Sequence, residues 1–291
     1  MFTVSILAAP SRADLRQARI DALRSRWNAG GTRWLDTGIA AEFAVQSAPA
    51  DFWEAWAQLQ AEGFDLAIQT SEGRAKSVLI ADMDSTMINQ ECIDELADFA
   101  GVGARVAAIT ARAMNGELNF DEALNERVGL LAGLSESVVD EVLASRITLA
   151  AGGPALLATM RAKGAYSALV SGGFTVFTGP IAAKLGFDEN RANVLYAKDG
   201  ILTGEVARPI LGSAAKVEAL REITDRLGLG VEQAIAVGDG ANDLAMIQLA
   251  GAGVALHAKP SVAAQAKLRV NHGDLTALLY LQGYHREEFA S

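Results

Sequence analysis

The fold of this chain is decided by residues 77–86, which read SVLIADMDST. The apolar run after Ser77 is typical of strands in parallel sheets, which are buried on both faces. Asp82 and Asp84 follow this run, two positions apart. Two carboxylates this close repel each other unless a cation compensates their charge. The stretch therefore predicts a buried strand that ends at a cation-dependent site.

Two later stretches repeat the pattern. Residues 166–170 read YSALV and lead into SGG at 171–173, and residues 233–237 read QAIAV and lead into GDGAND at 238–243. A helical pattern follows each of them. Strands that alternate with helices are typical of an open α/β sheet, whose ligands bind beyond the carboxyl ends of the strands. The sequence predicts an α/β fold with a parallel sheet and one shared site.

The three strand ends carry the chemistry of a metal site beside an anion site. The third strand end adds two carboxylates, Asp239 and Asp243, and the side-chain amide of Asn242. Hard oxygen ligands are what Mg²⁺ prefers. The hydroxyl of Ser171 and the backbone amide of Gly172 are suited to hold an anion. Any one of these motifs alone could be a helix cap or a turn.

Lys216 adds a cation to this group. We predict Ser213 as the N-cap of its helix, and the spacing to Leu220, Ile223 and Leu227 places Lys216 on the inward face. A lysine that points inward needs an anionic partner. A lysine whose charged end reaches solvent is the alternative.

The segment before residue 76 has a composition of its own. It carries all four tryptophans and ends in the polar stretch TSEGRAK at 70–76, as a linker would. Its apolar pattern predicts the order β-α-β-β-α-β, which suits a ferredoxin-like unit. We expect strands at 2–7, 32–35, 42–45 and 64–69, one helix capped by Ser11 and Asp14, and another that begins near Asp51.

This first segment also resembles the small ACT-type regulatory domains attached to amino-acid enzymes. We place the ferredoxin-like (ACT-like) α+β domain at residues 1–72 and expect it to regulate the enzyme or to pair two subunits into a homodimer. Aromatic residues are enriched in interface cores, which favours pairing. Tryptophans packed in the domain's own core are an equal alternative.

The strand-end motifs together resemble those of the haloacid dehalogenase superfamily. They are DMDST at 82–86, SGG at 171–173, Lys216, and GDGAND at 238–243. The resemblance implies a Rossmannoid parallel sheet with a helical cap. It also implies a Mg²⁺-dependent enzyme that passes through an aspartyl-phosphate.

Within this superfamily, residues 77–285 resemble the phosphatases that act on O-phosphoserine. NQECIDEL at 89–96 and the tract at 118–127 resemble the cap of those enzymes, which we place at about 91–150. The resemblance implies hydrolysis of O-phosphoserine to serine and phosphate, the last step of L-serine biosynthesis. Two alternatives stay open, a phosphotransferase that uses another amino-acid hydroxyl such as homoserine, and an amino-acid sensor that has lost catalysis.

The resemblance assigns a role to each residue of the core motifs. Asp82 is implied as the nucleophile, and Asp84 as the general acid and base. Mg²⁺ would be held by Asp82, the backbone carbonyl of Asp84 and Asp239, while Asp243 orients its water. The phosphoryl oxygens would be held by Ser171, Gly172, Lys216 and Asn242.

Substrate recognition is expected in the cap. The resemblance places Glu91 on the substrate ammonium and Arg127 on its carboxylate, through paired hydrogen bonds. Asn119 and Glu122 have the spacing of a capping box, so Phe120 opens a helix whose next two turns reach Arg127. Phe120 would then cover the substrate. The alternative is that Phe120 belongs to the core and Arg127 is a surface charge.

Composition excludes several classes of protein. With 51% apolar residues the chain is not disordered, and a net charge of −10 disfavours nucleic acid and anionic membranes as partners. No run approaches the roughly 18 apolar residues of a membrane span, and no basic leader suggests a signal peptide. The single cysteine, Cys92, rules out an internal disulfide, so we expect a cytoplasmic protein.

Overall fold

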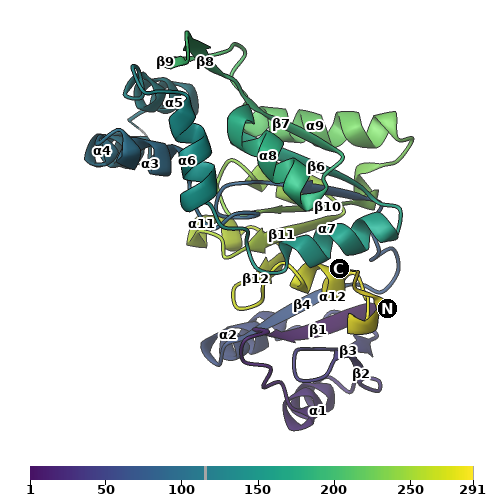
Figure 1. The fold of residues 1–291 in the computed structure, drawn as a ribbon. Helices are drawn as coiled ribbons and strands as arrows, with labels where there is room; N and C mark the ends of the chain where they lie inside the picture. Colours follow the sequence, from purple (N-terminus) through teal and green to yellow (C-terminus); the bar gives the residue numbers. More distant parts are fainter. Residues whose placement is uncertain (115–116, 291) are drawn as a thin grey trace. The chain divides into compact units, whose positions relative to one another are not determined.

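The computed structural model describes residues 1–114 and 117–290 (Figure 1). A small antiparallel sheet is formed by the first part of the chain, and a larger parallel sheet by the rest. Among the described residues, no helix has the length and the apolar character needed to cross a membrane.

The N-terminal sheet has the ferredoxin-like strand order that the sequence predicts. Its order is β2-β3-β1-β4, and its paired strands are antiparallel. The elements are β1 (Phe2–Ala8), α1 (Gln17–Arg26), β2 (Arg33–Asp36), β3 (Ala40–Val45), α2 (Phe52–Ala61) and β4 (Phe64–Thr70). The order β-α-β-β-α-β is therefore confirmed.

The two helices of this part share one core with one face of its sheet. Val4 and Ile6 of β1 pack with Ile20 of α1 and Leu59 of α2. Three tryptophans pack against this core while Trp53 is 48% exposed. For Trp27, Trp34 and Trp56 the structure thus favours packing within the domain, the second of the two explanations given above.

The predicted start of the first helix is wrong. The helix α1 begins at Gln17, and Arg16, not Ser11, occupies its N-cap position. The Asp14 carboxylate is 2.7 Å from the Arg12 guanidinium, so it does not complete a capping box. A turn at residues 10–12 precedes the buried Leu15. Burying Leu15 thus requires a turn where the local pattern predicts helix.

The parallel sheet places the first predicted strand between the other two. Its order is β12-β11-β10-β5-β6-β7, which confirms the α/β fold. The strands are β5 (Val78–Ala81), β6 (Tyr166–Phe174), β7 (Glu189–Asn193), β10 (Ala234–Gly238), β11 (Ala252–Leu256) and β12 (Leu268–Val270). All four residues of β5 are buried, as a strand covered on both faces requires.

Helices lie between these strands, and one helix and one 3₁₀ turn follow the last strand, β12. They are α7 (Gly153–Ala162), α8 (Thr175–Leu185), α9 (Ser213–Arg226), α10 (Leu244–Leu249), α11 (Pro260–Ala263) and α12 (Ala277–Leu281), with the short 3₁₀ turns η1 (Val231–Gln233) and η2 (Arg286–Glu288). The helix α9 begins at Ser213 itself, one residue earlier than the prediction, which placed Ser213 at the N-cap position. Every residue of α12 is buried, and this helix contacts β1.

The segment between β5 and α7 is helical, as expected for a cap. It contains α3 (Cys92–Phe99), α4 (Gly103–Met114), α5 (Phe120–Gly129) and α6 (Ser137–Ser145). A hairpin of β8 (Leu195–Lys198) and β9 (Ile201–Val206) follows β7. Asp199 and Gly200 at its turn both have positive φ, at 53° and 75°, as a type I′ turn requires.

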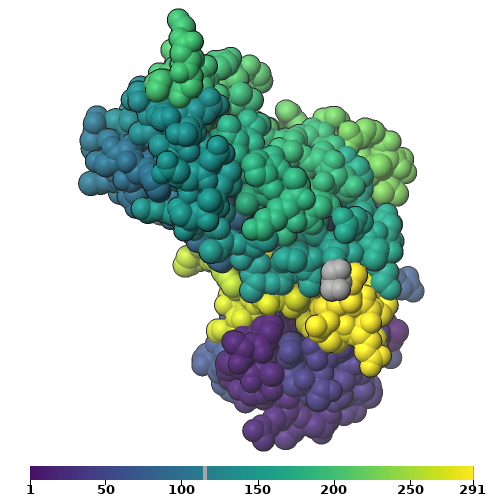
Figure 2. Space-filling model, viewed as in Figure 1, coloured from purple at the N-terminus to yellow at the C-terminus, as the bar shows by residue number. Residues whose placement is uncertain are grey.

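The chain divides into two compact units. One comprises residues 1–80, 151–167 and 220–291, and the other comprises residues 81–150 and 168–219. The N-terminal residues therefore share a unit with the C-terminal residues, and Figure 2 shows the yellow C-terminal residues directly against the purple N-terminal ones. The proposed boundaries, 1–72 and 77–285 with a cap at about 91–150, stay a prediction.

Candidate active site

A buried ion pair joins the end of β5 to the first turn of α9. The Lys216 ammonium lies 2.6 Å from Oδ1 of Asp82, and neither side chain is more than 7% exposed. The backbone N–H of Met83 donates to the same oxygen at 2.8 Å. The expectation that Lys216 points inward toward an anion is therefore confirmed. Removing either partner would leave an uncompensated buried charge, which costs about 3–5 kcal/mol.

Three buried carboxylates form a group that can hold a metal ion. Asp82, Asp239 and Asp243 each offer one carboxylate oxygen, and these atoms lie within 4.8 Å of one another. The backbone N–H of Gly240 donates to Asp243 at 3.0 Å and fixes its position. Gly238 permits this approach, because a Cβ there would collide with the Asp243 carboxylate. A donor set made of carboxylate oxygens suits a hard divalent cation.

Asp84 occupies a position that favours its protonated form. Burial and the charge of Glu91 raise the pKa of Asp84 to about 7, while the Cys92 backbone N–H, 3.0 Å from Oδ1, opposes this shift. A carboxyl group with a pKa near neutrality can both donate and accept a proton under working conditions. A Cβ on Gly173 would lie 2.8 Å from Oδ2 of Asp84, so only glycine leaves room for this carboxyl group.

The SGG tract lies in the irregular end of β6. Ser171 is fully buried, and its Oγ accepts the N–H of Gly173 at 2.9 Å. The ring of Phe120 lies over two glycines, since an added Cβ would be 3.1 Å from it at Gly172 and 3.2 Å at Gly212. The partly buried Phe120 therefore lies beside the predicted anion site, and its covering of a substrate stays a prediction.

The cap supplies a cation among carboxylates. The Arg127 side chain is partly buried, and its Nε donates to the carbonyl of Ala123 at 3.2 Å. Burial lowers the pKa of the Arg127 guanidinium, against the opposing charges of Asp94 and Glu91. Burial and the charge of Glu91 raise the pKa of the Asp94 carboxyl group. Arg127 and Glu91 thus lie within electrostatic reach of each other.

Local hydrogen bonds orient both predicted cap residues. Ser85, at a φ of 53°, donates from Oγ to the exposed Glu91 carboxylate at 2.7 Å. The capping box at Asn119 and Glu122 is present with both hydrogen bonds at 2.9 Å, as predicted. It starts α5 at Phe120 and so fixes where Arg127 emerges two turns later.

Asn242 and Cys92 are the remaining residues near the site. Asn242 is partly buried in the loop after β10, where a Cβ on Gly240 would collide with its side-chain oxygen. Cys92 is buried, and burial with the nearby charge of Asp84 raises the pKa of its thiol. A thiol held neutral in this way is no nucleophile.

Sequence reasoning missed Asn193, at the end of β7. Its side chain is 3% exposed, and Nδ2 donates to the carbonyls of Gly172 at 2.9 Å and Leu211 at 3.2 Å. Its Oδ1 accepts the N–H of Leu211 at 2.7 Å. Asn193 thus ties the SGG tract to the segment that leads into the Lys216 helix. The polar sequence ENRAN at 189–193 gave no sign of a strand.

Comparisons with known proteins agree with this geometry. The family model described as haloacid dehalogenase-like hydrolase matches residues 79–248. A phosphoserine phosphatase of Polaromonas sp. (strain JS666 / ATCC BAA-500) is 49% identical over 205 residues, 69% of this chain and 87% of that protein. Three other phosphoserine phosphatases, at 40–45% identity, are longer, and the chain spans 55–65% of their length.

Two solved structures are similar to this one. A HAD-family hydrolase of Salmonella enterica subsp. enterica serovar Typhi matches with a TM-score of 0.88 and 29% identity, over 97% of this chain and 98% of that one. A phospho-aspartyl intermediate analogue of phosphoserine phosphatase matches with a TM-score of 0.66 and 40% identity, over 71% of this chain and 98% of that one.

Replacing Asn193 by alanine should destabilise the anion site. The change leaves three backbone groups without these hydrogen bonds, the carbonyl of Gly172 and the N–H and carbonyl of Leu211. Each unsatisfied buried group costs about 1–3 kcal/mol. We expect the free energy of unfolding in urea to fall by about 3 kcal/mol or more, the lower sum for these three groups. Asn190→Ala is the matched control, because Asn190 accepts one hydrogen bond, from Thr178 in the same region. Equal losses in both variants would contradict the assignment.

Proposed function

The chain belongs to the haloacid dehalogenase-like hydrolases, and we propose that it hydrolyses O-phosphoserine to serine and phosphate through an aspartyl-phosphate on Asp82. The buried pair of Lys216 and Asp82, 2.6 Å apart, carries this proposal. A carboxylate that is ionised, oriented and hidden from bulk water is what nucleophilic attack on phosphorus requires. The 49% identity to a phosphoserine phosphatase supports the choice of substrate.

The first step transfers the phosphoryl group to the enzyme. A carboxylate oxygen of Asp82 forms a bond to phosphorus while the bond from phosphorus to the serine oxygen breaks. Asp84, whose pKa lies at about 7, donates its proton to the leaving serine oxygen. Lys216, Ser171, the amide of Gly172 and Asn242 would hold the phosphoryl oxygens, where negative charge develops.

The second step releases phosphate. Asp84, now ionised, takes a proton from a water molecule whose oxygen attacks phosphorus. The bond between phosphorus and Asp82 breaks, and the carboxylate returns to its pair with Lys216. One residue thus serves as acid and then as base, and its raised pKa suits both tasks.

We propose Mg²⁺ as the cation of the carboxylate group. Asp82, the backbone carbonyl of Asp84 and Asp239 would bind it, and Asp243 would orient a bound water. When bound, the ion neutralises phosphate charge that otherwise repels the nucleophile. The closeness of three buried carboxylates supports this assignment.

Recognition of the amino-acid part is assigned to the cap. Glu91 would bind the substrate ammonium and Arg127 its carboxylate, with Phe120 covering the bound substrate. The hydrogen bond from Ser85 to Glu91 and the electrostatic proximity of Glu91 and Arg127 support a pair of opposite charges for a zwitterion. The Phe120 ring lies beside Gly172, 3.1 Å from where a Cβ would be, and this position supports its covering role.

The alternatives are separated by product analysis. The intact ion pair of Lys216 and Asp82 argues against a sensor that has lost catalysis. With homoserine present, we expect the phosphate released to equal the serine formed. Phosphohomoserine among the products would indicate a phosphotransferase.

The other expectations from the sequence concern assembly and location. An ACT-like regulatory role and homodimer formation by residues 1–72 stay predictions, and light scattering of the intact protein tests the second. Trp53, 48% exposed, is an aromatic side chain that such an interface would bury. The cytoplasmic location stays a prediction from the single cysteine.

Asp82→Asn should abolish turnover. The change keeps the shape of the side chain but removes the nucleophile and one ligand charge. We expect phosphate release from O-phosphoserine to fall below detection, and EDTA to have the same effect on the unaltered chain. Near-normal turnover in a clean preparation of the variant would exclude the aspartyl-phosphate route.

Arg127→Ala should separate recognition from chemistry. A charged paired contact is worth about 1.5–3 kcal/mol, so KM for O-phosphoserine should rise roughly tenfold to a hundredfold. A phosphate ester without a carboxylate, p-nitrophenyl phosphate, should be much less affected. Arg112→Ala is the control, since the exposed Arg112 pairs with Glu126 on the cap. Equal losses on both substrates would show that Arg127 acts in folding or chemistry instead.

A further inference from the structure

One buried carboxylate of the N-terminal domain binds three successive backbone amides of the C-terminal part. Asp65 in β4 is 1% exposed. Its Oδ1 accepts the N–H of Asn271 at 2.9 Å, and its Oδ2 accepts those of His272 at 3.0 Å and Gly273 at 2.8 Å. Hydrogen bonds to an ionised acceptor are about twice as strong as neutral ones. Asp65 therefore fixes the backbone of residues 271–273, the turn after β12.

Gln60 reinforces this contact from α2. Its Nε2 donates to Oδ1 of Asp65 at 3.0 Å, and its Oε1 accepts Nδ2 of Asn271 at 2.8 Å. The ring Nε2 of His272 lies 3.1 Å from the carbonyl of Gln60. Two residues of the N-terminal domain thus surround turn 271–273 with hydrogen bonds.

The same turn holds His257, the residue after β11. The carbonyl of Gly273 is 2.7 Å from Nε2 of His257, and the backbone N–H of His257 donates to the carbonyl of Val270 at 2.7 Å. His257 has a φ of 47°, a conformation that residues other than glycine adopt at an energetic cost. Such a conformation persists only where the surroundings impose it, and here the turn does so.

The residues after His257 contact Asp239, a candidate metal ligand. Two residues further, the backbone N–H of Lys259 donates to the backbone carbonyl of Asp239 at 3.2 Å. Asp239 is one of the three carboxylates grouped for a cation. A continuous series of contacts therefore runs from Asp65 through Gly273, His257 and Lys259 to Asp239.

We propose that Asp65 is a positioning residue for Asp239, and that the N-terminal domain sets the cation affinity of the site from within the same chain. The proposal rests on the function above only in taking the carboxylate group as a metal site. Asp65 touches neither substrate nor metal. It acts by restricting the backbone that presents Asp239, as partners behind a metal ligand commonly do.

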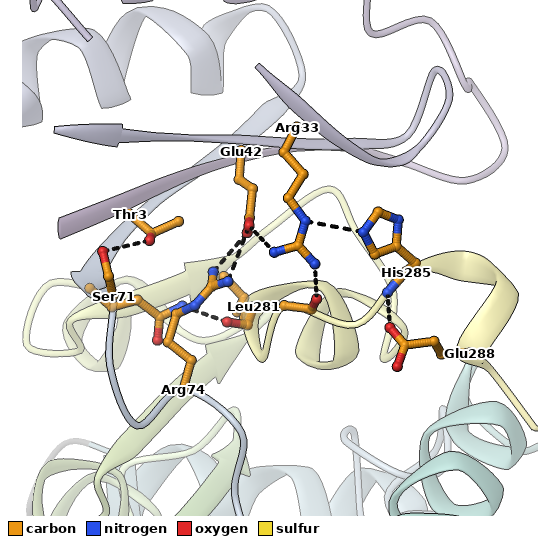
Figure 3. A network of polar contacts seen from close by, with 10 residues as sticks. Thr3, Arg33, Glu42, Ser71, Arg74, Leu281, His285 and Glu288 are labelled. Carbon is orange, nitrogen blue, oxygen red and sulfur yellow. Dashed lines mark hydrogen bonds and ion pairs between the residues drawn. The ribbon is translucent and has the colours of Figure 1, made fainter. Parts of the chain in front are cut away.

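A second anchorage joins the same two parts of the chain elsewhere (Figure 3). Glu42, buried on β3, pairs with Arg33 at 2.9 Å and Arg74 at 2.7 Å. Arg33 also donates to the carbonyl of Gly283 at 3.0 Å, and its Nε lies 3.1 Å from the ring of His285. These contacts hold residues 283–285 and not turn 271–273. The domain therefore stays attached when Asp65 is altered.

A further contact of this second anchorage provides the matched control. Tyr280 of α12 donates from its hydroxyl to the Asp36 carboxylate at 2.7 Å. Tyr280→Phe removes a hydrogen bond between the same two parts of the chain without touching turn 271–273. A general loosening of the domain would appear in both variants, whereas the positioning role would appear only in Asp65→Asn.

The test measures Mg²⁺ binding to the full chain by isothermal titration calorimetry, without substrate. Asp65→Asn keeps the shape but turns an amide NH₂ toward backbone N–H donors. We expect the Mg²⁺ dissociation constant to rise roughly tenfold, the low end of the effect of groups behind a ligand, and Tyr280→Phe to leave it unchanged. An unchanged constant in Asp65→Asn, or an equal rise in both variants, would overturn the proposal.

Hydrogen exchange of the Lys259 amide provides a readout independent of metal and activity. This amide donates to Asp239, so its exchange should accelerate about tenfold in Asp65→Asn, in line with the metal effect. Should Asp65→Asn fail to fold, Gln60→Ala removes the supporting contacts and should give a smaller change in the same direction. Unaltered Lys259 exchange in the folded variant would also overturn the proposal.

A double-mutant cycle tests the path itself. If Asp65 acts through His257, the variant Asp65→Asn/His257→Ala should bind Mg²⁺ no more weakly than the weaker single variant. Additive losses would show that the two residues act separately and would overturn the path. A chain that binds Mg²⁺ as described but releases no phosphate from O-phosphoserine would refute the proposed function and leave the positioning role intact.

Discussion

The buried ion pair between Lys216 and Asp82 is the interaction on which the rest of the site depends. The two charges are 2.6 Å apart and shielded from solvent. Removing either one would therefore cost several kcal/mol of folding free energy. The pair holds the end of β5 to the start of α9. Asp239 and Asp243 add negative charge close to Asp82, and a divalent cation bound there would supply the charge balance that one lysine cannot.

Around this pair, single polar side chains organise the backbone of distant segments. Asn193 satisfies Gly172 and Leu211 at once, and Asp65 satisfies the three amides of turn 271–273. Buried backbone groups must find hydrogen-bond partners. A side chain that supplies several partners therefore fixes loop geometry more firmly than apolar packing, which has no direction. Loops that present catalytic groups benefit from this directionality.

Local patterns were reliable only where no other residue competes for the same side chains. The capping box of Asn119 and Glu122 is confirmed because its two hydrogen bonds depend only on one helical turn. The similar pattern at Ser11 and Asp14 is wrong, since Arg12 takes the Asp14 carboxylate and Leu15 is drawn into the core. The strand β7 was missed because its polar residues lack the apolar run that identified its neighbours in the sheet.

The sequence by itself determined the parallel sheet, the ferredoxin-like strand order, and which strand ends carry carboxylates, hydroxyl and amide groups. Apolar runs and strand ends are local properties, and parallel strands bring their carboxyl ends to one edge. Only the tertiary structure decided the roles of Asn193 and Asp65. Their partners lie 18–21 and 206–208 residues away, and Asp65 stands between Phe64 and Leu66 in an ordinary strand. Hydrogen bonds over such distances depend on sheet order and packing, which no local pattern encodes.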